Sequence, residues 1–124
     1  MSAPQHLQHL LEQIVERDRR YRLDAYRFVL ATLNATVQQL PAPRHITGRE
    51  LLDGIRDEGL KQFGPLTRSV FEHWGVQTTE DFGHIVFRLV DAGLLGKTEQ
   101  DRLEDFRQAY DFGETFERGY RYVD

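Results

Sequence analysis

Apolar residues recur at helical spacing through most of the chain. In residues 4–19 they stand three and four positions apart, which places them along one face of an amphipathic helix: Leu7, Leu10, Leu11, Ile14 and Val15. The same spacing predicts further helices at residues 24–40, 47–63, 66–74, 78–93 and 98–110. The pattern therefore predicts a mainly all-α fold, a compact bundle of five to six short helices in a single domain over residues 1–124.

Helix starts and stops support this prediction. Thr47 and Glu50 have the spacing of a capping box, in which each side chain bonds the backbone amide of the other residue. Residues 78–81 and 98–101 repeat the pattern, and Asp24 is expected to cap the second helix. Proline or glycine, which end helices, follow the predicted elements at Pro41, Gly64, Pro65, Gly75 and Gly93.

The pattern is ambiguous in the C-terminal aromatic segment. Phe112, Phe116 and Tyr120 are spaced by four, as on a helix, whereas residues 120–123 alternate as in a short strand. The sequence therefore leaves open a minor strand pairing between residues 44–47 and 119–123, in addition to the helical bundle.

The composition excludes several classes of protein. The chain has 124 residues and no cysteine, so disulfides, thiolate metal sites and cysteine nucleophiles are excluded. Its apolar runs are too short to span a bilayer, and the first predicted helix is apolar on one face only, unlike a secretory signal. We therefore expect a cytoplasmic protein that does not enter a membrane.

Charge is unevenly distributed along the chain. The net charge is −4, but residues 1–49 contain seven arginines against four acidic residues, so this part carries +3 and the remainder −7. A phosphate-binding surface would have to lie in the N-terminal part alone, because the rest repels a polyanion.

No constellation typical of catalysis is present in the sequence. His6 with His9, and Asp81 with His84, have spacings that occur in metal sites, but no third ligand accompanies either pair. Phosphate-binding loops, dinucleotide fingerprints and nucleophile elbows are absent from the sequence. We therefore predict no metal, no cofactor and no enzymatic activity; an enzyme would require histidines that converge on one pocket.

Residues 66–90 have the outline of a helix-turn-helix unit with Gly75 in the turn. Phe71 stands where a small residue is expected, and Asp81 falls on the first inward position of the second helix. That helix offers His84 and Arg88 as its basic residues, fewer donors than base and phosphate contacts usually need. The sequence favours a packing unit over a DNA-reading unit.

Two clusters are candidate binding surfaces. The arginines of residues 17–27 suit a phosphate or an acidic partner, although interspersed acidic residues also fit a charged helix junction. The C-terminal aromatic residues either close the core or leave an exposed anchor for a protein partner. The candidate binding residues are Arg19, Arg20, Arg22, Arg27, Tyr110, Phe112, Tyr120 and Tyr122.

Several residue strings taken together resemble a family of small bacterial proteins found mainly in planctomycetes and verrucomicrobia. The resemblance covers roughly residues 10–117 and is carried by strings such as those at residues 45–52, 63–65, 73–76, 80–87 and 110–112. It implies a bacterial cytoplasmic protein, and it implies no activity, ligand or catalytic residue.

The sequence as a whole favours a non-enzymatic module that binds another protein, with self-association into a homodimer as one form of this function. The alternative is a nucleic-acid-binding protein that uses the divergent helix-turn-helix of residues 66–90 together with the N-terminal arginines.

Overall fold

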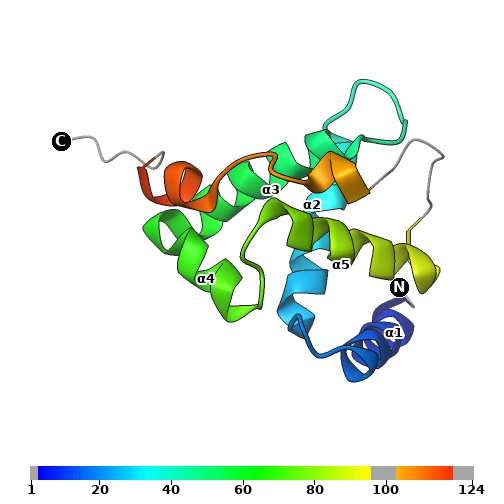
Figure 1. Ribbon diagram of the computed structural model, residues 1–124. Helices are drawn as coiled ribbons and strands as arrows, with labels where there is room; N and C mark the ends of the chain where they lie inside the picture. The colour runs from blue at the N-terminus through cyan, green and yellow to red at the C-terminus, as the bar shows by residue number, and fades with distance from the viewer. Residues whose placement is uncertain (1–2, 96–102, 119–124) are drawn as a thin grey trace.

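Five α-helices account for most of the chain in the computed structural model, which describes residues 3–95 and 103–118 (Figure 1). They are α1 (Ala3–Arg17), α2 (Leu23–Gln38), α3 (Gly48–Phe63), α4 (Thr67–His73) and α5 (Thr79–Asp91). Shorter helical turns are η1 (Gly64–Leu66), η2 (Leu103–Phe106) and η3 (Gly113–Arg118), the last a π-helical turn. The described residues contain no strand, which confirms the all-α prediction.

Helices α2, α3 and α5 pack against one another and form the centre of the bundle (Figure 1). Helix α1 packs on α2 at the edge of the molecule, and α4 packs on α3. After α5 the described chain resumes with η2, which lies against α3 and α5, and η3 packs on α3 and α4. Residues distant in sequence therefore meet on α3.

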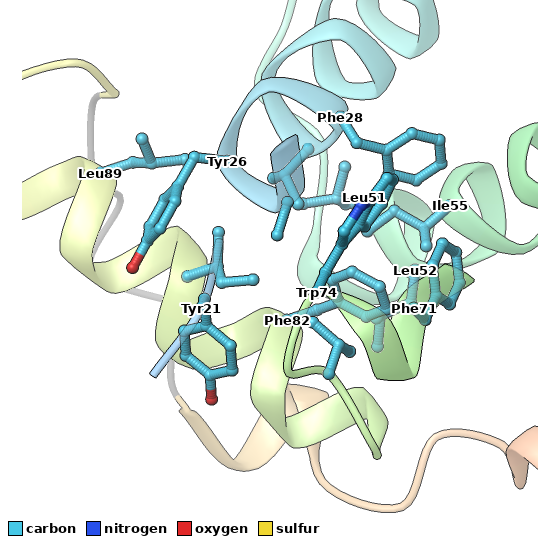
Figure 2. Packing of buried hydrophobic residues seen from close by; sticks show 14 of the residues in the cluster. Tyr21, Tyr26, Phe28, Leu51, Leu52, Ile55, Phe71, Trp74, Phe82 and Leu89 are labelled. Carbon is cyan, nitrogen blue, oxygen red and sulfur yellow. The ribbon is translucent and has the colours of Figure 1, made fainter. Parts of the chain in front are cut away.

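The core is rich in aromatic rings, several of which converge on Phe71 of α4 (Figure 2). Its ring lies 5.1–5.9 Å, centroid to centroid, from those of Phe28, Trp74, Phe82, Phe112 and Phe116. Rings at these distances attract each other in edge-to-face and tilted arrangements in addition to burying apolar area. A small residue at this position, as in a DNA-reading helix-turn-helix, would leave the centre of the core empty.

The capping box that was predicted at the start of α3 is confirmed. The Thr47 hydroxyl accepts from the Glu50 amide at 3.0 Å, and the Glu50 carboxylate accepts from the Thr47 amide at 2.8 Å. Arg44 donates to both oxygens of Glu50, at 3.0 and 2.9 Å. The Arg44 guanidinium and the Thr47 amide together lower the pKa of Glu50 to about 2.

Glu50→Gln is expected to make unfolding less sensitive to acid. Because the folded pKa of Glu50 lies below its usual range, its carboxylate stabilises the fold at neutral pH, and this contribution is lost as the pH falls toward 2. The variant should be less stable than the parent at pH 7, yet lose less stability between pH 5 and pH 3. Urea unfolding at these three pH values measures the difference, and Glu12→Gln on exposed α1 surface is the control. Parallel curves for Glu50→Gln and the parent would contradict the assignment.

Two local predictions are wrong. Asp24 does not cap α2: Arg22 occupies the N-cap position, and Asp24 lies in the first turn, where its charge favours the helix N-terminus. In residues 103–110, the described part of the predicted sixth helix, the 3₁₀ turn of η2 takes the place of an α-helix, and Gln108 adopts a left-handed backbone (φ 52°) that ends any regular helix before Tyr110. Residues 98–101, the third predicted capping box, lie outside the described residues.

Phe106 fits closely between α3 and α5. Its burial there explains why residues 103–110 do not continue as the α-helix that their periodicity predicts. A Cβ atom added to Gly48 of α3 would stand 2.9 Å from the Phe106 ring, and one added to Gly83 of α5 would stand 2.8 Å from it. The ring fills a notch between the two helices and is 2% exposed. Residues 44–47 form no strand, and residues 119–123, their predicted partner, lie outside the described part of the chain.

Candidate functional site

The loop between α1 and α2, which carries three of the candidate arginines, is fastened to the turn after α4. The Arg22 amide donates to the Trp74 carbonyl at 3.0 Å, and the Arg22 side chain donates through Nε to the His73 carbonyl at 3.0 Å. Gly75 has a φ of +94°, and an added Cβ would stand 2.2 Å from the Arg20 carbonyl oxygen. Only glycine allows this approach of the two backbones.

Asp81 at the start of α5 anchors the same loop from inside. Asp81 is 5% exposed, and its carboxylate accepts from the Tyr21 hydroxyl at 2.5 Å and from Arg20 Nη2 at 2.9 Å. The backbone amides of Gln77 and Thr78 donate to its other oxygen at 2.8 and 3.2 Å. Burial, with the Asp81 carboxylate as the next cause, raises the pKa of Tyr21 well above its usual range. Asp81 therefore starts α5 and also positions the arginine loop.

Tyr21 lies between two guanidinium groups. The Cζ atoms of Arg20 and Arg88 stand 5.2 and 5.1 Å from the centroid of its ring, within the range of cation–π attraction. Arg88 also pairs with Asp18. Arg88, one of the two basic residues that the DNA-reading alternative has on this helix, is thus engaged in contacts within the molecule.

Arg19, Arg20 and Arg22 line one pocket of about 540 Å³ at this junction. His73, Trp74 and Gly75 form its other side. We call it the arginine pocket. Two carboxylates, Glu16 and Glu72, also line it, and Glu72 pairs with Arg68 at 3.1 Å. Arg27, the fourth candidate arginine, instead contacts Gln8 of α1.

The aromatic candidates lie on the other side of α4. Phe112 is 4% exposed within the core, and Tyr110 donates its hydroxyl to the Leu52 carbonyl at 2.7 Å. Burial raises the pKa of Tyr110 well above its usual range. Their burial favours the interpretation that these rings close the core. Tyr120 and Tyr122 lie outside the described residues, so their predicted role as an anchor stays a prediction.

The helix-turn-helix outline of residues 66–90 is present as α4, a turn and α5. Helix α5, however, is covered along much of its length, because α2 and α3 pack on it and η2 lies over Gly83. Its inward residues are Thr79, Asp81, Phe82, Gly83, Ile85 and Leu89. Burial of this helix gives no support to DNA reading by α5.

Two other pockets do not have this concentration of arginines. The first, of about 440 Å³, is mainly apolar and lies between α2, α3 and α5, with Arg44 at its edge already paired to Glu50. The second, of about 690 Å³, mixes the basic Arg68 and Arg107 with the acidic Glu80 and Asp111. By contrast, the arginine pocket is lined by three arginines from one loop.

Within residues 3–95 and 103–118, histidine and carboxylate side chains form no group of three that could hold a metal ion. No helix in these ranges is long and apolar enough to cross a membrane.

No protein-family model, curated protein or solved structure matches the chain. The resemblance to small bacterial proteins therefore stays a prediction.

The residues that complete the pocket cannot be predicted from the sequence. His73, Trp74 and Gly75 have the local pattern of a helix end and its stop signal, and nothing in that pattern links them to residue 20. Asp81 was interpreted as part of a helix start, which is correct, but its contacts with Arg20 and Tyr21 span about 60 residues. Such contacts have no signature in a single sequence.

Proposed function

We propose that this chain is a non-enzymatic protein-binding module whose arginine pocket binds an acidic segment of a partner. The observation that carries the proposal is the convergence of Arg19, Arg20 and Arg22 on one pocket. Arginine is enriched among the residues that dominate binding energy at protein interfaces, where its planar group pairs with carboxylates through two hydrogen bonds.

Anchoring of the guanidinium groups supports the proposal. Arg22 is held by the His73 carbonyl and Arg20 by Asp81, although Arg20 keeps 54% of its side-chain surface exposed. An arginine that is already oriented loses less conformational freedom on binding than a free surface arginine. Glu72, the nearest acidic residue on α4, is partly neutralised by Arg68. The pocket therefore keeps an excess of positive charge.

Nucleic acid is the alternative ligand of the same arginines. The charge of −7 on residues 50–124 argues against nucleic acid, because a long polyanion would contact this acidic part of the chain as well as the pocket. A short acidic segment meets the pocket alone. Residues 50–124 of a second copy of this chain are themselves acidic, and binding of one of their segments would make the module a homodimer.

Titration with a fluorescein-labelled peptide rich in aspartate and glutamate tests the proposal by fluorescence anisotropy. The double variant Arg19→Gln/Arg22→Gln should weaken binding about tenfold or more, the effect of losing two interface arginines. The matched control, Arg17→Gln/Arg27→Gln, removes the same charge outside the pocket and should change affinity less than about twofold.

Equal losses in the two double variants would overturn the proposal, because binding would then depend on overall charge. Tighter binding of duplex DNA than of the acidic peptide, at each of several salt concentrations, would overturn it in favour of nucleic acid. Light scattering of the chain alone identifies self-association. A dimer that dissociates in Arg19→Gln/Arg22→Gln, and not in the control, would support the proposal with a second copy as the acidic partner.

A further inference from the structure

The arginine pocket holds more hydrogen-bond donors than one carboxylate can use. Among the described residues, Arg22 donates a hydrogen bond through Nε to the His73 carbonyl, and Arg20 donates one through Nη2 to the Asp81 carboxylate. The terminal nitrogens of Arg22, and Nε and Nη1 of Arg20, make no hydrogen bond within that part of the chain, and Arg19 is exposed and lines the same pocket. A guanidinium group has five N–H donors, so most of this donor capacity is open to a ligand.

We infer that the arginine pocket receives a phosphomonoester, carried on a phosphorylated serine, threonine or tyrosine of the protein partner. This inference rests on the proposed function and names its ligand. A phosphorylated side chain carries a charge of about −1.5 to −2 and three acceptor oxygens. A carboxylate carries a single negative charge and two oxygens, which one guanidinium group satisfies. Three arginines around one pocket therefore fit the phosphate better.

The position of Arg20 permits this binding without loss of its internal contact. Arg20 bonds Asp81 through Nη2 alone, so its remaining donors can meet a phosphate while Asp81 keeps its ion pair. Arg22 is fixed in the same manner by the His73 carbonyl. The two groups are held on either side of Tyr21 in sequence and line the same pocket.

The surroundings of the pocket disfavour a nucleic-acid strand. Glu16 and Glu72 line the same pocket as the arginines, and they would repel the successive phosphates of such a strand. A single phosphate gains from the three arginines at close range, whereas the further phosphates of a polynucleotide lie beyond the arginines and gain less from them. This arrangement favours a phosphorylated protein over DNA or RNA.

NMR titration of the full chain with three peptides of one sequence tests the inference. The peptides carry phosphoserine, glutamate or serine at one central position, among aspartate and glutamate residues. The phosphoserine peptide should bind about tenfold more tightly than the glutamate peptide, and should shift the side-chain Nε–Hε signals of Arg20 and Arg22. In Arg22→Lys, which keeps the charge but loses the planar group, this preference should fall to about twofold or less.

The outcomes separate this inference from the proposed function. Equal binding of the phosphoserine and glutamate peptides, with both weakened in Arg19→Gln/Arg22→Gln, would overturn the inference and leave the proposed function standing. A failure of all three peptides to bind would overturn both. Phosphoserine binding that Arg19→Gln/Arg22→Gln leaves unchanged, in a variant whose thermal unfolding matches that of Arg17→Gln/Arg27→Gln, would place the phosphate site elsewhere and overturn the inference.

Discussion

Gly75→Ala is expected to lower the free energy of unfolding by about 2–5 kcal/mol. The backbone of Gly75 has a φ of +94°, a conformation that costs residues with a side chain about 1–2 kcal/mol. The added Cβ would also stand 2.2 Å from the Arg20 carbonyl oxygen, and overpacking of this kind costs about 1–3 kcal/mol more. Since the opposing atom belongs to the backbone, no rotation of a side chain relieves the contact. Urea unfolding followed by circular dichroism measures the loss.

Gly93→Ala is the matched control for this expectation. Gly93 also has a positive φ, +80°, but an added Cβ would meet nothing within 4 Å among the described residues. This variant should lose about 1–2 kcal/mol, the cost of the backbone conformation without the steric contact. If both variants lose the same amount, the close approach of the arginine loop to Gly75 is wrong. If only Gly75→Ala also weakens binding of the acidic peptide, the turn is needed to hold the pocket together.

The parts of the fold that the sequence predicted are those with a local cause. Helices α1 to α5 follow from apolar spacing and from stop signals such as Gly75, and the box of Thr47 and Glu50 lies within one helical turn. These elements depend on residues a few positions apart, so a single sequence contains their signal. The extent of α2 was predicted well even though its cap was assigned to Asp24 in place of Arg22.

The remainder depends on contacts between distant segments. Residues 103–110 have helical spacing, yet the chain follows the notch between Gly48 and Gly83 because Phe106 is buried there. Likewise, the arginine cluster is evident in the sequence. The sequence does not show that three of its arginines line one pocket while Arg27 contacts α1. That division depends on where the turn after α4 packs, which periodicity does not specify.

Asp81→Ala is expected to cost about 3–5 kcal/mol of stability, because it removes a buried carboxylate that accepts four hydrogen bonds and leaves their donors without an acceptor. The carboxylate accepts from Arg20, from the Tyr21 hydroxyl and from two backbone amides at the start of α5. With alanine, the Tyr21 hydroxyl, 0% exposed, would lose its acceptor, and the first turn of α5 would lose its cap. Thermal and urea unfolding measure the change.

Two further variants apportion that loss. Tyr21→Phe removes one of the donors to Asp81 and should cost about 1 kcal/mol, while Asp53→Ala removes an exposed carboxylate from two weak ion pairs and should change stability by less than about 1 kcal/mol. A loss in Asp81→Ala no larger than that in Asp53→Ala would contradict the buried arrangement.

If Asp81→Ala stays folded at low temperature, its Arg20 is no longer anchored. Peptide affinity should then fall even though the pocket has gained net positive charge, because orientation of the guanidinium, beyond its charge, is what Asp81 supplies.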